Sequence, residues 1–429
     1  MKPSLVVKPV AGSATLVRLP VELIQYSLSF LDLDSLINAA LSCPKIITGQ
    51  VLLRLIHHTV LPEAILVQQV WDLRKTSATP KVDAARLLWY RVPAPTKYTM
   101  ADALRLATFH DTVTYFARRF EQDALEEQPR LRSAGLRPEF MERNRFERAF
   151  YRFELYRIII TRNPPTMRQE LRDLFFSFFS TWEIEQLACV RDYLIRLVAE
   201  PFNYLVDHDV TWGYLGVSYI SQHSSRRGNA IVAHGLNCVY DICAVSGYEA
   251  WHYYISRGET KESRPRATQS INEIFRVGAN KSLSESLLDQ LPFWTLSNRK
   301  KSILAGRPFY DEPDNGPPFM WAWVYNDTSA GQLVANPRTR GCRRWAFPFW
   351  DLSRLTKAEL ICDPAIPINI MTQSPEYELE EYNTEERLES LRLTQNARCL
   401  IWESGGTGWY DVNDLTKIKW SRDKPDWLY

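Results

Sequence analysis

The densest group of side chains able to do acid–base or metal chemistry lies between residues 207 and 252. Histidine, cysteine and carboxylate side chains are the usual ligands of transition metals, and they need only meet in space after folding. No spacing within the group matches a known ligand motif, and Asp207-His208-Asp209 is equally typical of a polar turn that ends a helix. A metal or hydrolytic site and a structural role both stay open, and we favour the structural role. The group consists of Asp207, His208, Asp209, His223, His234, Cys238 and His252.

Catalytic signatures are missing from the rest of the sequence. It contains no glycine-rich phosphate loop, no GxSxG, no HExxH and no zinc-ligand pattern. Glu183 and Glu185 lie two positions apart in a predicted helix, so they point to different faces and do not form a catalytic pair. We therefore predict no catalytic residue, no cofactor and no metal, and we favour a binding protein over an enzyme.

Composition narrows the class of partner. The 429 residues include 52 basic and 50 acidic side chains, a net charge of +2, which gives no electrostatic reason to expect nucleic acid or a membrane surface. No apolar run approaches the roughly 18 residues of a membrane span. The seven cysteines are scattered and contain no CxxC, which favours a reducing compartment, either the cytoplasm or the nucleus.

Apolar residues recur at helical spacing through the first two thirds of the chain. We expect one helix to start near Thr99 with Asp102 in its first turn. Two further amphipathic helices are expected from Phe146 to Ile160 and in the segment TWEIEQLACVRDYLIRL. The residues predicted to face the core are Leu106, Phe109, Val113, Phe116, Phe120, Phe146, Phe150, Phe153, Tyr156, Ile160, Ile184, Leu187, Cys189 or Ala188, Leu194 and Leu197.

Segments poor in apolar residues or rich in Pro and Gly divide the chain at residues 92–97, 256–270 and 305–318. Near the C-terminus, RCLIW and GWYDV resemble strands on either side of the turn ESGGTG. The basic cluster Arg338, Arg340, Arg343 and Arg344 and the acidic run 376–389 are interpreted as solvated faces or loops. The predicted parts are a flexible N-terminus (1–17), a three-helix module (18–60), a connecting segment (61–98), a helical body (99–304) and a Trp-rich mixed portion (305–429).

The stretch from Val21 to Leu31 is apolar on two faces of its predicted helix. Val21, Ile24, Leu28 and Leu31 form one stripe, and Leu23, Tyr26 and Phe30 form the other. A surface helix normally carries one such stripe, and a module this small does not bury two by itself. The second stripe therefore predicts a binding partner or a contact with the rest of the chain.

Residues 18–60 resemble an F-box. The resemblance rests on Leu19-Pro20-x-Glu22-Leu23, on Leu28-Ser29-Phe30-Leu31, and on an acidic turn before a second helix that ends at Cys43. Ser27 stands where the family usually has an aliphatic residue, and the tryptophan often found three positions after Cys43 is missing. TWEIEQLACVRDYL and RRWAFPFWDLSRL also resemble segments of F-box-like proteins from filamentous fungi.

The resemblance implies a substrate receptor of a cullin-RING ubiquitin ligase. Its partners would be the adaptor subunit, through it a cullin, and a protein substrate that the rest of the chain recruits. The expected fold is mainly α: an N-terminal three-helix F-box, a helical body and a smaller mixed α/β C-terminal portion. The alternatives are an N-terminal hairpin packed on the body of the protein, an enzyme with its site between residues 207 and 252, and a scaffold outside any ligase. The residues expected to bind the adaptor are Leu19, Pro20, Leu23, Ile24, Leu28 and Leu31.

Overall fold

The described part of this computed structural model is mainly helical, as predicted, and carries one two-stranded antiparallel sheet near the C-terminus. None of its helices combines the length and the apolar character needed to cross a membrane. All of the expected F-box except Val60, including its six adaptor-binding residues, lies outside the described residues. The structure describes residues 60–76, 100–161, 165–220, 226–257, 291–329, 332–361 and 385–420.

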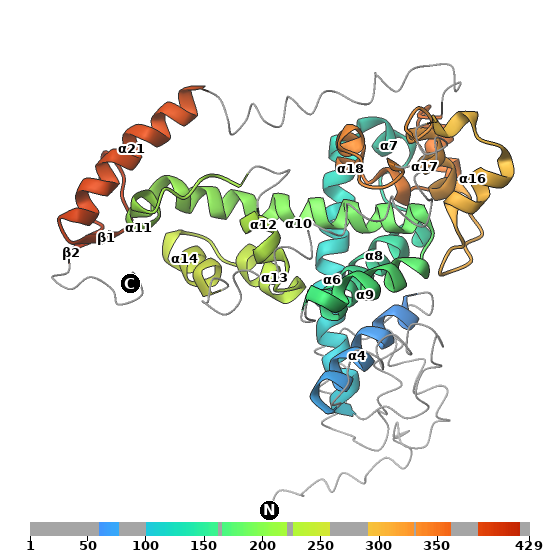
Figure 1. Cartoon of the computed structure of the whole chain (residues 1–429), viewed down its shortest axis with the longest axis horizontal. Helices are drawn as coiled ribbons and strands as arrows, with labels where there is room; N and C mark the ends of the chain where they lie inside the picture. Colours follow the sequence, from blue (N-terminus) through green and yellow to red (C-terminus); the bar gives the residue numbers. More distant parts are fainter. Residues whose placement is uncertain are drawn as a thin grey trace, which may run out of the picture.

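The α10 helix (Thr181–His208) runs along the length of the molecule and joins its two ends. In Figure 1, α16 and α17 lie near one end of α10, and α11, α21 and the small sheet lie at the other. The α6 helix (Met100–Glu127) starts where the sequence predicts and has Asp102 in its first turn. Its buried residues Leu106, Phe109, Val113, Phe116 and Phe120 are those that the helical spacing predicts.

The α8 helix (Phe140–Thr161) lies at the centre of the fold and is buried on nearly all of its faces. Helices α4, α6, α9 and α10 pack around it. Phe146 and Phe150 are buried as predicted, but so are Arg145, Arg148 and Arg152. The prediction of an amphipathic helix with one polar, solvated face was therefore wrong for α8. Its arginines are buried and pair with carboxylates from other segments instead of facing water.

The segment predicted to be a connector begins with the helix α4 (Leu61–Thr76), which packs on α8 and α6. Its residues Ala64 and Val67 are fully buried and belong to the main hydrophobic core. The first part of the predicted C-terminal portion contributes to the same core through Phe349 and Trp350. The ring of Phe349 stacks on Phe146 of α8 with 4.3 Å between the ring centroids.

The other helices are mostly short. The α-helices are α7 (Pro129–Ala134), α9 (Pro165–Ser177), α11 (Val210–Tyr214), α12 (Arg226–Val232), α13 (Leu236–Ala244), α14 (Tyr248–Arg257), α16 (Asn298–Ala305), α17 (Gly316–Val324), α18 (Arg340–Arg344), α19 (Leu352–Lys357) and α21 (Glu385–Glu403). The 3-10 helices are η4 (Phe293–Thr295), η6 (Pro337–Thr339) and η7 (Phe347–Phe349).

The end of the described chain corrects both predicted strands. GWYDV is not a strand, because beyond Gly408 it contains only the isolated bridge residues Trp409 and Asp411. RCLIW is the last part of α21 rather than a strand, because it continues a segment of helix-forming Glu, Leu, Arg and Gln residues. The strand β1 (Gly406–Gly408) lies within the expected turn and pairs with β2 (Ile418–Trp420). A second, small hydrophobic cluster joins this part to α11 through Val210, Trp402, Tyr410 and Ile418.

Candidate functional site

The group between residues 207 and 252 converges on Asp209, where α10 ends and α11 begins. Oδ1 of Asp209 accepts a hydrogen bond from the backbone N–H of Trp212 at 2.7 Å, which caps α11. Oδ2 accepts a bond from the Tyr248 hydroxyl at 2.6 Å and lies 3.4 Å from Nε2 of His252. We call Asp209, Tyr248 and His252 the Asp209 corner.

The Asp209 corner combines a buried carboxylate with a partly exposed imidazole. The side chain of Asp209 is 2% exposed, whereas that of His252 is 39% exposed. Burial raises the pKa of Asp209, and the hydrogen bond from Tyr248 and the charge of His252 oppose that rise. Burial next to the same carboxylate raises the pKa of the Tyr248 hydroxyl.

The other members of the sequence group lie elsewhere or serve the fold. Asp207 accepts a hydrogen bond from Tyr219, and Nδ1 of His208 lies 2.9 Å from the Tyr410 carbonyl oxygen. His234 is exposed in the turn before α13, and Cys238 is half-buried within that helix. His223 lies outside the described residues. In the described ranges, no three His, Cys, Asp or Glu side chains gather as a metal site.

A carboxylate that holds an imidazole forms half of the arrangement used in general-base catalysis. The other half is a nucleophile or a water within hydrogen-bond reach of the imidazole. Within the part of the chain that the structure describes, His252 meets the Asp209 carboxylate and the rings of Trp212 and Tyr248. None of these three supplies an alcohol or thiol nucleophile, so the geometry favours the structural interpretation of the group. The sequence reading missed Tyr248, whose signal is its four-residue helical spacing from His252.

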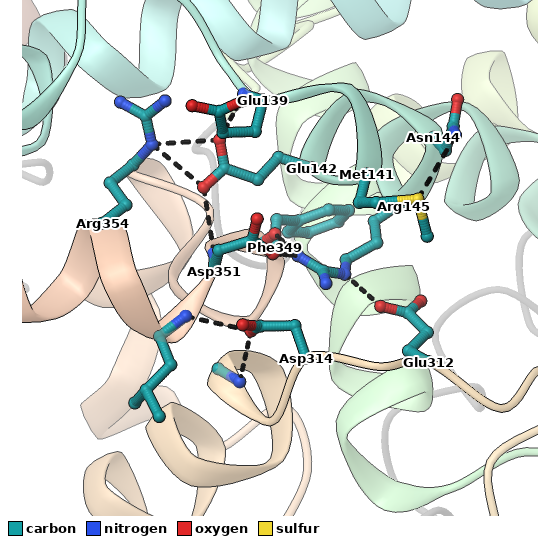
Figure 2. A network of polar contacts seen from close by, with 12 residues as sticks. Glu139, Met141, Glu142, Asn144, Arg145, Glu312, Asp314, Phe349, Asp351 and Arg354 are labelled. Atoms are coloured by element: carbon teal, nitrogen blue, oxygen red, sulfur yellow. Dashed lines mark hydrogen bonds and ion pairs between the residues drawn. The ribbon is translucent and has the colours of Figure 1, made fainter.

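A second cluster of charged residues lies in the centre of the fold, where no site was predicted from the sequence. Arg145, Arg148 and Arg152 lie on one face of α8 at positions i, i+3 and i+7, and their side chains are at most 2% exposed. We call these three residues the arginine row. Arg145 and Arg148 both bond to Glu312, and Nη1 of Arg145 lies 2.6 Å from Oδ1 of Asp351. Figure 2 shows Arg145 next to Glu312, with Asp351 close by.

The third member of the arginine row connects helices from distant parts of the chain. Nη2 of Arg152 lies 2.9 Å from Oε1 of Glu63 on α4 and 3.0 Å from Oε1 of Glu183 on α10. Burial raises the pKa of the Glu63 carboxyl, and the charges of Arg152 and Arg148 oppose that rise. The arginine row therefore binds α4, α8, α10 and residues 312–351 to one another.

Aromatic rings cover the arginine row where carboxylates do not. The guanidinium of Arg148 lies 4.8 Å from the centroid of the Tyr310 ring, and that of Arg152 lies 5.1 Å from that of Phe179. Nε and Nη1 of Arg148 are fully buried and bond to no other protein atom among the described residues. The rings and carboxylates leave these atoms no surface in contact with solvent, so the row is a structural element rather than a ligand site.

A further buried ion pair adjoins the arginine row. Nε of Arg354 lies 2.9 Å from Oε1 of Glu142, and the same carboxylate oxygen accepts the backbone N–H of Asp351 at 2.9 Å. Figure 2 shows this shared contact. Arg354 also donates to the Leu131 and Gly135 carbonyl oxygens, which fixes α7 and the turn after it against α19.

Residues 181–194 and 343–355, which are far apart in the sequence, contact each other. Arg343 lies 3.2 Å from Glu185 and 2.7 Å from Asp192, and the side chain of Gln186 donates to the Pro348 carbonyl oxygen at 2.8 Å. Although burial opposes it, the charges of Arg343 and Arg191 lower the pKa of Asp192 to about 2.

These contacts correct the interpretation of the basic cluster as a solvated face. Arg343 is 3% exposed, because the carboxylates of α10 bind it inside the fold. Arg338 is exposed as expected, and the half-buried Arg344 pairs with Glu127. Glu183 and Glu185 serve different partners, Arg152 and Arg343, as their spacing predicts.

Comparison with known proteins gives no relative from which a function could be inferred. No protein family, curated protein or solved structure matches this chain.

Proposed function

We propose that the protein is the substrate-recognition subunit of a cullin-RING ubiquitin ligase and that it binds the adaptor through residues 18–60. The observation that carries this proposal is the sequence spacing of Leu19-Pro20, Leu23, Leu28 and Leu31, which predicts a helix with two apolar stripes. One stripe would pack on the second and third helices of the module, and the other would face the adaptor.

The attachment of α4 supports this proposal. This helix directly follows the F-box-like segment, and its Glu63 is 1% exposed and paired with Arg152. Val60, Ala64 and Val67 add fully buried apolar contacts. A receptor has to hold its substrate at a defined position relative to the ligase, because group transfer depends strongly on the position of the reactants. A stiff connection between the adaptor-binding module and the body meets that requirement.

The test is affinity capture of the tagged full-length protein, followed by quantification of the adaptor and the cullin. We expect both to be captured, and we expect Leu28→Asp or Leu31→Asp to remove them while the melting temperature stays close to that of the wild type. Leu393→Asp is the matched control, because Leu393 is 64% exposed on α21, far along the chain from the module. Failure of the wild-type protein to capture the adaptor would contradict the proposal.

The contact between Asp209 and His252 favours one second candidate, a hydrolase that uses His252 as its general base. Ester hydrolysis by the purified protein tests this alternative against the variant His252→Gln. Activity that disappears in the variant, without a change in melting temperature, would replace the receptor proposal. Equal background rates for the two proteins would leave the Asp209 corner a structural feature.

A further inference from the structure

The helix α16 is exposed along its outer face although it lies within the folded body. None of its residues is buried, and Arg299, Lys300 and Ile303 point away from the core, with Ile303 68% exposed. Trp294 of the preceding η4 is 56% exposed. Single exposed apolar side chains are common on folded proteins, and what distinguishes this helix is that the exposed cations Arg299 and Lys300 accompany Ile303 on it.

Contacts on the inner side hold α16 in place. The Ser297 hydroxyl accepts the N–H of Lys300, which caps the start of the helix, and the Leu304 carbonyl oxygen accepts a hydrogen bond from Thr181 at the start of α10. Gly306 ends the helix with a φ of 73°, a conformation that side chains disfavour. The outer face is thus ordered before any partner binds, which lowers the entropic cost of association.

The positive charge of this surface is not neutralised within the described part of the chain. Arg299, Lys300 and Arg307 form no ion pair with a described carboxylate, and Nζ of Lys301 lies 5.6 Å from the centroid of the Phe293 ring. Asp327, in the turn whose Asn326 carbonyl oxygen accepts the N–H of Trp294, is exposed and likewise unpaired among the described residues. By contrast, the buried Arg145, Arg152 and Arg343 are paired with carboxylates.

We propose that α16 and η4 bind an acidic peptide segment of a partner protein, with the peptide carboxylates on Arg299 and Lys300 and an apolar side chain against Trp294 and Ile303. Charge complementarity selects an acidic ligand, and the exposed Trp294 and Ile303 select one that also carries apolar residues. The net charge of +2 gives no electrostatic reason to expect nucleic acid or an anionic membrane instead. That the peptide belongs to the ubiquitination substrate rests on the proposed function, whereas the binding itself does not.

Fluorescence anisotropy with the full-length protein tests this surface. The probe is a fluorescein-labelled synthetic peptide in which glutamates alternate with leucine and phenylalanine. We expect the double variant Arg299→Glu, Lys300→Glu to weaken binding by about tenfold or more. We expect Ile303→Ser to weaken it several-fold and a probe with serine in place of leucine and phenylalanine to bind less tightly.

The matched control is Arg130→Glu, Arg132→Glu on the exposed face of α7, which carries the same change of charge and should leave the affinity unchanged. Unaltered binding by the α16 double variant would overturn the proposal, as would equal competition from a single-stranded oligonucleotide or an anionic vesicle. A tenfold gain in affinity after Glu376, Glu378, Glu380 and Glu381 are changed to Gln would assign the surface to the chain's own acidic run. Adaptor capture by the double variant should stay normal, so that failure here and failure of the receptor proposal are distinguishable.

Discussion

The arginine row and the Asp209 corner are both built from charged and polar side chains, but they differ in burial and in reach. The arginines are at most 2% exposed and bind segments from four distant parts of the chain. In the Asp209 corner only the carboxylate is fully buried, while His252 is 39% exposed. The corner joins the end of α10 to α11 and α14, and a separate small hydrophobic cluster joins α11 to α21 and the C-terminal sheet.

The difference indicates that a charged residue can contribute to the stability of the whole body when it is buried, or to the stability of one end of the molecule when it lies near the surface. A buried cation without its partner is costly, because the remaining charge is isolated from water. A charge near the surface recovers hydration when its partner is removed, so its loss has local effects. We therefore expect substitutions in the arginine row to unfold the body and those in the Asp209 corner to loosen one end.

The largest effect is expected for Glu312→Ala. This change would leave the buried Arg148 without an ion-pair partner among the described residues and Arg145 with Asp351 alone, although Glu312 itself is 18% exposed. We expect the free energy of unfolding to fall by about 3–5 kcal/mol in urea denaturation. Asp311→Ala, at an exposed neighbouring position, is the control and should change it by less than about 0.5 kcal/mol. Similar effects of the two substitutions would contradict the role assigned to the arginine row.

Arg343→Met tests whether residues 181–194 and 343–355 stabilise each other through the ion pairs of Arg343. The variant would leave the fully buried Glu185 without its cation, and we expect a loss of about 2–4 kcal/mol at neutral pH. The lowered pKa of Asp192 makes the wild-type ion pair stabilising above about pH 4, and this contribution falls as pH drops toward 2. The difference between the variant and the wild type should therefore shrink in acid. Arg338→Met, at an exposed position, should be neutral at every pH.

The sequence predicted the helices better than it predicted their charged contacts. The apolar spacing located α6 and the aromatic residues of α8, because burial of one stripe repeats every three or four residues. It treated Arg343 as a surface residue and gave no indication that Arg145 is buried, since charged side chains are rarely buried and the partners of both lie more than a hundred residues away. It also brought Asp209 and His252 into one candidate group, but the contact between them depends on how α14 packs against α10.

A smaller, local effect is expected for Asp209→Asn. The amide retains the cap on α11 but weakens the contacts with Tyr248 and His252. We expect backbone amides of residues 406–420 to exchange hydrogen about tenfold faster, while amides of α8 keep their protection. Equal acceleration in α8 would show that the corner also determines the stability of the body.

The smallest effect concerns two buried carboxyls between α6 and α8. Burial raises the pKa of both Glu121 and Glu147 to about 7, although Arg143 and Arg118 oppose the rise. Because the folded pKa exceeds the unfolded value of about 4.5, the folded protein loses stability as pH rises from about 4.5 to 7. Glu147→Gln should remove part of this loss. We expect the free energy of unfolding of the variant, relative to that of the wild type, to be about 1 kcal/mol higher at pH 8 than at pH 5. A stability difference that does not change with pH would contradict this assignment.

The central claim is that the buried ion pairs join α4, α8, α10 and the 340–357 segment into one cooperative unit. Hydrogen exchange of the wild-type protein, followed by mass spectrometry, tests it most directly. We predict that the slowest amides of these four segments exchange at a common rate set by global unfolding, and that residues 406–420 exchange faster. Exchange in α4 or in residues 340–357 that is a hundredfold faster than in α8 would contradict the claim, because those segments would then open while the body stays folded.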